Sequence, residues 1–347
     1  MDLENNSVEG TEEQNHEKEV QNEQLDNAGS VDTAFVQSTI ERITAEVNKL
    51  IIGNETLLEL TLVGMLSGGH ILLEGVPGVA KTLLSKLLAR SIGINFQRIQ
   101  FTPDLMPSDL LGTSIFNLKE SEFQFKKGPI FSNLILIDEI NRAPAKTQAA
   151  LLEVMEERQV TIDGHTYPMS QPFFVVATQN PIEHEGTYRL PDAQLDRFLF
   201  KLQVEHPSFE DEKAMLDRFK STFNLKTSEE KVEAVVNPED VEKCRQIIEQ
   251  IHIKDELIDY IAKIVHETRN HGEIYLGASP RASLSILRTA KGLAAMRGRD
   301  FVTPDDIQQV CIPVLNHRII LTPEKEMSGG TEKEVINSII KEIEVPR

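Results

Sequence analysis

The sequence predicts an α/β fold with a parallel sheet flanked by helices, followed by a helical domain. Two continuous apolar runs, residues 134–137 and 173–177, are typical of strands buried on both faces of a parallel sheet. A third apolar run, residues 71–73, leads into a glycine-bearing loop and then an apolar-periodic helix. Beyond about residue 207 only helical periodicity remains. We therefore expect a sheet-bearing domain at 32–207 and an all-helical domain at 208–347.

Composition and charge argue against several classes of protein. Residues 1–31 hold nine acidic residues, one lysine and no aromatic residue, so we expect a disordered acidic tail. The net charge of −19 argues against a large nucleic-acid interface. No run approaches the roughly 18 apolar residues of a membrane span, and the N-terminus does not resemble a signal sequence. Cys244 and Cys311 lack a partner motif, which favours reduced core thiols and a cytoplasmic protein.

Two helices, the first of them amphipathic, are expected before the first strand. Apolar residues recur at three- and four-residue spacing from Val36 to Leu50, and a second helix is expected over residues 57–66. The segment 51–55, which contains Ile52 and Gly53, separates these helices. The glycine pair after Ser67 forms the turn into the first strand.

The stretch that begins at residue 71 has the order strand, glycine loop and helix that a phosphate-binding loop requires. Gly75 and Gly78 allow successive N–H groups to point at a polyanion, and the helix dipole adds to that field. Lys81 would reach the β- and γ-phosphates, and the Thr82 hydroxyl would ligate Mg²⁺. Ala80 stands where glycine usually precedes the lysine, so an ordinary glycine turn is the alternative. The candidate nucleotide-binding residues here are Gly75, Val76, Pro77, Gly78, Val79, Ala80, Lys81, Thr82 and Leu83.

A projecting hairpin is expected between the second strand, residues 96–101, and the strand at 134–137. Residues 113–127 alternate aromatic and polar side chains around a charged turn, and residues 128–131 are expected to resume a helix. A hairpin inserted into a helix contributes little to a core, so we interpret it as a functional loop.

Two carboxylates, Asp138 and Glu139, follow the strand at 134–137. In parallel α/β folds the carboxyl end of a central strand lies beside the phosphate loop. Asp138 would hold Mg²⁺ through its water shell, and Glu139 would orient and polarise the attacking water. The alternative is a pair of acidic residues at a helix N-terminus.

A helix at 145–157 and a second hairpin at 159–170 precede the strand at 173–177. The hairpin prediction depends on Asp163-Gly164, a strong turn signal. Asn180 follows the strand and could hold the attacking water or the γ-phosphate; the alternative is a turn residue before proline.

Two arginines are further candidates. Arg197 ends a short helix over residues 190–198, before a strand at 198–204, and is either a solvated cation at a helix terminus or an arginine finger that reaches a neighbouring subunit's nucleotide. Arg281 follows the helix-start signal Ser279-Pro280 and is either a surface arginine or able to contact the γ-phosphate from above. The helices of the second domain are expected at 209–223, 238–250, 255–270, 280–297, 304–314 and 331–343.

Five ordered motifs resemble those of the MoxR-type AAA+ ATPases, and the resemblance spans about residues 35–320. They are GVPGVAKT at 75–82, IDEINRAP at 137–144, ATQNP at 177–181, LPDAQLDRF at 190–198 and GASPR at 277–281. Alanine before the lysine is common in that family. The arginine at position 189, where relatives often carry proline, is a small departure.

The resemblance implies a role for each candidate residue. Lys81 and Thr82 would be Walker A, Asp138 and Glu139 Walker B, Asn180 sensor 1, Arg197 the arginine finger and Arg281 sensor 2. Ile52 and Gly53 would lie near adenine, and Arg142 could act between subunits. The two hairpins match the helix-2 insert and the pre-sensor-1 hairpin, and the expected sheet order is 5-1-4-3-2.

The resemblance also implies an activity: hydrolysis of ATP with Mg²⁺ in a hexameric ring. Hydrolysis would be used to remodel a partner protein, to mature it or to insert metal into it. The ATPase would act together with a protein that carries a von Willebrand factor A domain. Three alternatives stay open: a metal-chelatase motor subunit, a nucleic-acid-dependent motor, and a binding module regulated by nucleotide.

Overall fold

The computed structural model describes residues 31–75, 81–180, 188, 190–220 and 231–346. From Thr33 onward the chain forms one compact unit. All but the last residue of the expected acidic tail, 1–31, lies outside the described residues.

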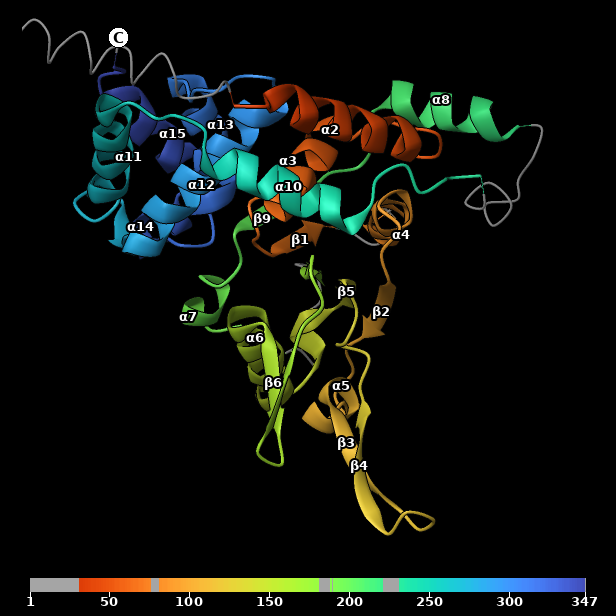
Figure 1. The fold of residues 1–347 in the computed structure, drawn as a ribbon. Helices are drawn as coiled ribbons and strands as arrows, with labels where there is room; N and C mark the ends of the chain where they lie inside the picture. The colour runs from red at the N-terminus through yellow and green to blue at the C-terminus, as the bar shows by residue number, and fades with distance from the viewer. Residues whose placement is uncertain (1–30, 76–80, 181–187, 189, 221–230, 347) are drawn as a thin grey trace, which may run out of the picture. The chain divides into compact units, whose positions relative to one another are not determined.

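A five-stranded parallel sheet lies at the centre of this unit (Figure 1). Its strands are β1 (Ile71–Gly75), β2 (Phe96–Gln100), β5 (Leu134–Asp138), β8 (Phe174–Gln179) and β9 (Phe200–Val204). Their order across the sheet is β2-β5-β8-β1-β9. If these five strands are numbered 1 to 5 along the chain and the sheet is read from β9 to β2, this is the expected order 5-1-4-3-2. Every residue of β5 is buried, as its continuous apolar run predicts.

Helices cover the sheet and bury its side chains. Those of the first half of the chain are α2 (Thr33–Val47), α3 (Glu55–Leu66), α4 (Lys81–Ser91), α5 (Pro107–Leu111), α6 (Ala145–Glu157) and α7 (Asp192–Leu195), with a 3-10 turn at Ile140–Arg142. Leu151 and Met155 of α6 join Ile135 of β5 and Val175 of β8 in one hydrophobic cluster. The helix α4 contacts β2 and β5.

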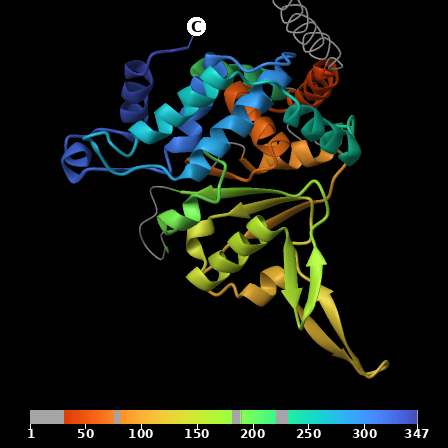
Figure 2. The same ribbon diagram turned by 60° about the vertical axis from the view of Figure 1, so that its left-hand side comes forward.

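Two antiparallel hairpins project from the sheet in the same direction (Figures 1 and 2). They pair β3 (Gly112–Asn117) with β4 (Glu122–Lys127), and β6 (Gln159–Ile162) with β7 (His165–Pro168). The ring centroids of Phe125 and Tyr167 lie 4.6 Å apart, so the hairpins support each other.

The helix expected at 128–131 is wrong, because this segment forms a turn. The Gly128 N–H donates to the Leu111 carbonyl and the Ile130 N–H donates to the Leu110 carbonyl. Both donors are bound to carbonyls at the end of α5, so the segment closes that helix and does not begin a new one.

The second half of the chain is mostly helical, with one small sheet. Its helices are α8 (Phe209–Phe219), α10 (Pro238–Glu249), α11 (Asp255–Glu267), α12 (Pro280–Met296), α13 (Pro304–Leu315), α14 (Pro323–Met327) and α15 (Glu332–Glu342). The prediction of an all-helical domain is wrong in one detail, since β10 (Ile274–Leu276) pairs with β11 (Ile320–Leu321). Strands of two or three residues are too short to display a period of two.

Two arginines bind the helices α10 and α12 to the turn that precedes β1. Arg245 of α10 donates to the Met65 carbonyl at 2.9 Å, and Arg288 of α12 donates to the Ser67 carbonyl at 2.8 Å. Both carbonyls lie at the C-terminus of α3, where the helix dipole favours cations. Through these bonds α10 and α12 are held at the amino-terminal edge of the sheet.

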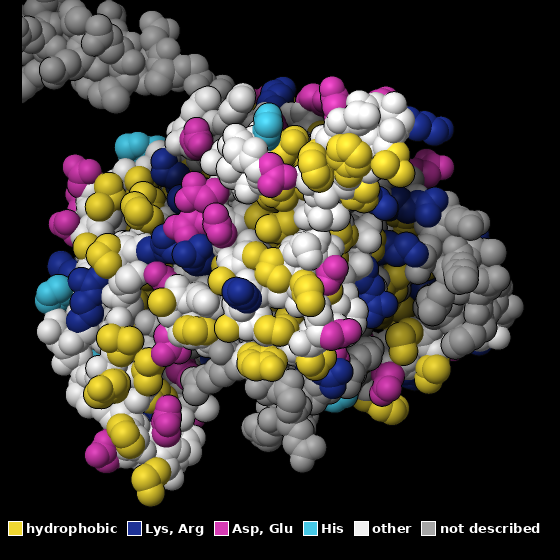
Figure 3. Space-filling model, turned by 90° about the horizontal axis from the view of Figure 1, so that it is seen from below, with side chains coloured by type: hydrophobic (Ala, Val, Ile, Leu, Met, Phe, Trp, Pro, Cys, Tyr) yellow, Lys and Arg dark blue, Asp and Glu magenta, His cyan; other side chains and the backbone are white. Residues whose placement is uncertain are grey.

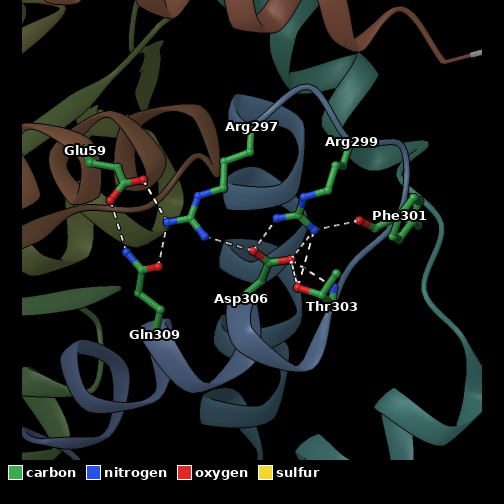
Figure 4. Close-up of polar contacts among 7 residues, drawn as sticks. All are labelled: Glu59, Arg297, Arg299, Phe301, Thr303, Asp306 and Gln309. Atoms are coloured by element: carbon green, nitrogen blue, oxygen red, sulfur yellow. Dashed lines mark hydrogen bonds and ion pairs between the residues drawn. The ribbon is translucent and has the colours of Figure 1, made fainter. Parts of the chain in front are cut away.

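A buried carboxylate, Asp306, anchors the start of α13 (Figure 4). Its side chain has no exposed surface and accepts hydrogen bonds from Arg299, Arg297 and Thr303. Arg297 also pairs with Glu59 of α3, which connects α13 to the first half of the chain. Burial acts to raise the pKa of Asp306, but the hydrogen bonds from Arg299 and Thr303 outweigh it and hold the pKa below its usual value.

Replacement of Asp306 by alanine should lower the free energy of unfolding by about 3 kcal/mol. This is the lower end of the range for breaking a buried ion pair, because both arginines keep access to water. Urea denaturation followed by circular dichroism measures the change. The exposed neighbour Asp305 supplies the control, and Asp305→Ala should stay within about 0.5 kcal/mol of the parent. Equal stability of the two variants would contradict the anchoring role.

Candidate nucleotide-binding site

The carboxyl ends of β1, β5 and β8 meet at one edge of the sheet, because the three strands are parallel and adjacent. Gly75 ends β1, Asp138 ends β5, and Asn180 directly follows β8. Lys81 opens α4 just beyond Gly75. The structure therefore brings the predicted Walker A lysine, Walker B acids and sensor 1 residue to the same edge. Residues 76–80 of the predicted phosphate loop lie outside the described residues.

Lys81 lies close to the carboxylates of this edge. Its ammonium donates to the Gly75 carbonyl at 2.5 Å. Burial lowers the pKa of Lys81, while the charges of Asp138 and Glu74 act in the opposite direction. Thr82 and Leu83, the next two residues of α4, are half-buried.

Asp138 is held by two side chains from neighbouring strands. Arg98 of β2 pairs with its Oδ2 at 2.5 Å, and the Thr178 hydroxyl of β8 donates to its Oδ1 at 3.3 Å. The carboxylate is almost buried, and Arg98 supplies the opposite charge that a buried carboxylate needs.

Glu139 adopts a left-handed backbone conformation, with φ of 57°. This region is uncommon for residues other than glycine, and such strain concentrates at functional sites. The Glu139 N–H donates to the Thr178 hydroxyl at 3.0 Å. Its carboxylate accepts from Gln100 Nε2 at 2.6 Å and pairs with Arg142 at 3.2 Å. Both partners contact Oε2 and so orient the carboxylate.

These residues fit a magnesium-bound nucleotide. Carboxylate and hydroxyl oxygens, here from Asp138 and Thr82, are the ligands that Mg²⁺ prefers. At Gly75 a Cβ atom would lie 2.4 Å from the Val204 carbonyl oxygen of β9, so β1 can end there only with glycine. The backbone at the entrance to the loop therefore has no room for a side chain.

Ile52 and Gly53, predicted to lie near adenine, form the break between α2 and α3. Gly53 has φ of +74°, and a Cβ there would lie 2.8 Å from Asp211 Cγ in the first turn of α8. Arg218 of α8 donates to the carbonyls of Asn48 and Lys49. This segment is therefore packed against α8.

Arg197 lies at the opposite edge of the sheet. It falls between α7 and β9, at the amino end of β9, whereas the phosphate loop follows the carboxyl end of the adjacent strand β1. A five-residue strand separates these edges by about 16 Å. Figure 1 accordingly shows α7 on the left of the sheet and α4 on the right. Arg197 Nη1 donates to the Leu152 carbonyl at 3.0 Å and pairs with Glu156 Oε2 at 2.7 Å.

Arg281 does not lie where we expected it. Its Nη2 pairs with Glu156 Oε1 at 2.8 Å. Glu156 lies at the end of α6, and Arg158, two residues further on, donates to the Gly68 carbonyl just before β1. Arg281 is therefore at the amino-terminal edge beside Arg197, not above the phosphate loop of its own chain. The physical reason is the attachment of α12 to the α3–β1 turn through Arg288.

Three contributors to these sites were missed from the sequence. From the sequence alone, Glu156 would be taken for a solvent-exposed residue of a helix. Gln100 would be taken for an ordinary residue of an edge strand. Arg318 is buried, with a side chain only 2% exposed, and it binds the segment that carries Arg197. It pairs with the Asp196 carboxylate at 2.7 Å and donates to the carbonyls of Phe198 and Leu199. The sequence offers one local sign of this role for Arg318: it belongs to the polar triplet 316–318, which directly follows the apolar helix α13.

Comparisons with known proteins agree with this geometry. Residues 70–200 match the family described as ATPase family associated with various cellular activities (AAA), and residues 266–339 match the AAA lid domain. The chain is 45% identical over 318 residues to the chaperone MoxR1 of Mycobacterium tuberculosis, which covers 89% of this chain and 83% of that protein. It is also 45% identical over 300 residues to the uncharacterized protein YeaC of Bacillus subtilis, with 86% and 92% covered.

A solved structure has the same architecture. A crystal structure from Cytophaga hutchinsonii, described as that of a candidate ATPase, superposes with a TM-score of 0.84 at 43% identity, covering 93% of this chain and 99% of that one. Among the described residues, no helix combines the length and apolar character needed to cross a membrane. On its motifs, its sheet order and these relatives, the chain belongs to the MoxR family of AAA ATPases.

Proposed function

We propose that this chain hydrolyses ATP as a subunit of a ring, and that it uses hydrolysis to remodel partner proteins. The observation that carries the proposal is the separation of two half-sites. Lys81, Asp138 and Glu139 share the carboxyl-terminal edge of the sheet, whereas Arg197 and Arg281 share the amino-terminal edge. Arginines so placed cannot serve the nucleotide of their own chain, but they can serve the nucleotide of a neighbour.

The separation of the half-sites also supports a closed ring. A contact in which one edge of a subunit meets the opposite edge of the next is heterologous, and such contacts close into rings when the rotation allows. We infer a hexamer from the family resemblance. Arg142, paired with Glu139, is a further candidate for contact between subunits.

Each residue of the carboxyl-terminal edge has a proposed role in hydrolysis. Lys81 and the backbone N–H groups of residues 75–80, except Pro77, which has none, bind the phosphates, and Ile52 and Gly53 lie beside adenine. Thr82 and Asp138 would hold a Mg²⁺ ion, which would neutralise charge on the phosphates. Glu139 polarises the attacking water and Asn180 orients it.

The neighbour completes the site with two cations. Arg197 and Arg281 stabilise the charge that develops on the γ-phosphoryl group in the transition state. We keep the division into a core at 32–207 and a lid at 208–347, so that Arg197 belongs to the core and Arg281 to the lid. Motion of the lid against the core then follows hydrolysis.

The hairpin β3–β4 is the proposed contact with the client protein. Its side chains Ile115, Phe116, Leu118 and Phe123 are exposed, and Leu118 is 85% exposed. Seen from the side on which the hairpins project, hydrophobic side chains lie among charged ones (Figure 3). Exposed apolar side chains of this kind mark interaction sites. The chaperone name of the relative MoxR1 supports remodelling or maturation of a partner. Metal insertion and a von Willebrand factor A domain protein as partner are suggested by the family resemblance alone.

Replacement of Lys81 by alanine tests whether nucleotide binds at this edge. The variant should bind ATP about 10- to 100-fold more weakly, because it loses a charge-assisted contact to the phosphates. Isothermal titration calorimetry with ATP and Mg²⁺ measures the affinity. Lys86→Ala, which removes an exposed lysine from the same helix, should keep the parent affinity. Equal affinity of Lys81→Ala and Lys86→Ala would contradict the proposed site.

A further inference from the structure

One carboxylate, that of Glu156, binds both arginines of the amino-terminal edge. Arg197 Nη1 lies 2.7 Å from Oε2, and Arg281 Nη2 lies 2.8 Å from Oε1. The two arginines come from segments 84 positions apart, one before β9 and the other in the first turn of α12. Glu156, in the last turn of α6, therefore joins three elements at one point.

The segments that carry the arginines are joined a second time beside Glu156. The Ser279 hydroxyl, two residues before Arg281, donates to Asp196 Oδ2 at 3.0 Å, and Asp196 directly precedes Arg197. Asp196 Oδ1 in turn accepts from the buried Arg318 at 2.7 Å. These bonds hold the backbone beside Arg197 and Arg281, whereas Glu156 acts on the two guanidinium groups themselves.

Electrostatics argues that Glu156 fixes this direction rather than adding stability. Its side chain is 36% exposed, and ion pairs with such access to water contribute roughly 0–1 kcal/mol to folding. Two guanidinium groups brought to one point repel each other, and a carboxylate between them removes that repulsion. Arg197 gains one further restraint on the same helix, its bond to the Leu152 carbonyl one turn before Glu156.

We propose that Glu156 is a positioning residue, which holds Arg197 and Arg281 as one pair of cations directed at the nucleotide of the neighbouring subunit. The inference rests on the proposed function, in which these arginines act between subunits. Preorganised cations are effective because they need no reorganisation as charge develops on the γ-phosphoryl group. Since Arg281 is attached to α12 and Glu156 to α6, the pair is formed only when the lid and the core are in this arrangement.

The test compares Glu156→Gln with Glu157→Gln, which changes an exposed carboxylate one position along the same helix. In assembled protein, Glu156→Gln should lower kcat about 10- to 100-fold, the effect of a small misplacement of catalytic groups. The KM for ATP should change less than about threefold, because the subunit that binds the nucleotide is intact. Glu157→Gln should keep both constants. Sedimentation of each variant confirms that the comparison is made at equal assembly.

Mixing experiments separate a role between subunits from damage within one. Glu156→Gln subunits mixed with Lys81→Ala subunits should recover turnover, because Lys81→Ala keeps the carboxylate and both arginines. A kcat equal to that of Glu157→Gln, or no recovery on mixing, would overturn the inference. If Glu156→Gln fails to assemble, Glu156→Asp decides: its shorter carboxylate should give an intermediate kcat, and a kcat equal to that of the parent overturns the inference.

The outcome also distinguishes this inference from the proposed function. A parent protein that does not hydrolyse ATP, or an Arg197→Ala variant with unchanged turnover, contradicts the proposed function itself. An active parent, an inactive Arg197→Ala variant and a fully active Glu156→Gln variant together contradict only the role of Glu156.

Discussion

Replacement of Arg197 by alanine is expected to lower kcat for ATP hydrolysis about 10³- to 10⁵-fold, which is the contribution of an arginine finger to phosphoryl transfer. Affinity for ATP should remain close to that of the parent, since Arg197 lies at the sheet edge opposite Lys81. Steady-state turnover of assembled protein, together with calorimetric titration of ATP, separates the two quantities.

Two controls accompany this prediction. Arg42→Ala removes an exposed arginine of α2 and should keep the parent kcat. Thermal unfolding checks that loss of the Arg197 contacts to Leu152 and Glu156 leaves the fold intact. An assembled Arg197→Ala variant that hydrolyses ATP at the parent rate would show that Arg197 is no finger.

Replacement of Glu139 by glutamine is the second change with a large expected effect. Loss of the group that polarises water should lower kcat about 10²- to 10⁴-fold, the usual contribution of general-base catalysis. ATP should still bind, because Lys81, Thr82 and Asp138 are unchanged. Glutamine keeps the size of the side chain and can still contact Gln100, which donates to Glu139 in the parent. Glu153→Gln, an exposed change on α6, serves as the control.

A Glu139→Gln variant that turns over ATP like Glu153→Gln would contradict the assignment of the catalytic base. The same variant also provides a search for the client, because bound ATP should persist. A captured protein with a von Willebrand factor A domain would support the proposed partner. Captured nucleic acid, or a metal-chelatase subunit, would favour one of the two motor alternatives instead.

The parallel sheet could be predicted because buried strands leave a clear pattern. The apolar runs of β5 and β8 have no polar interruption, so their burial on both faces and their place at the centre of the sheet follow. Six helices of the second half of the chain were predicted to within a few residues at most ends, because starts such as those at Thr303 and Asn237 carry capping residues. The short helix α14 was missed.

The arrangement of the arginines could not be predicted, since it depends on contacts between distant segments. Arg281 was expected above the phosphate loop, yet the bond from Arg288 to the end of α3 holds α12 at the other edge. Glu156 has no local signal, because a glutamate at the end of a helix is usually solvated. Its partners become visible only when the sheet order and the position of α12 are known.

Mixing Lys81→Ala subunits with Arg197→Ala subunits tests the central claim, that each nucleotide lies between two subunits. The first variant lacks its own nucleotide site but offers both arginines, and the second has the nucleotide site but lacks its finger. Each should be inactive alone. After co-assembly at equal amounts, turnover should rise toward about a quarter of the parent rate, because random mixing makes about one interface in four complete. Turnover that stays at the level of the separate variants, in rings shown to contain both, would contradict a site shared between subunits.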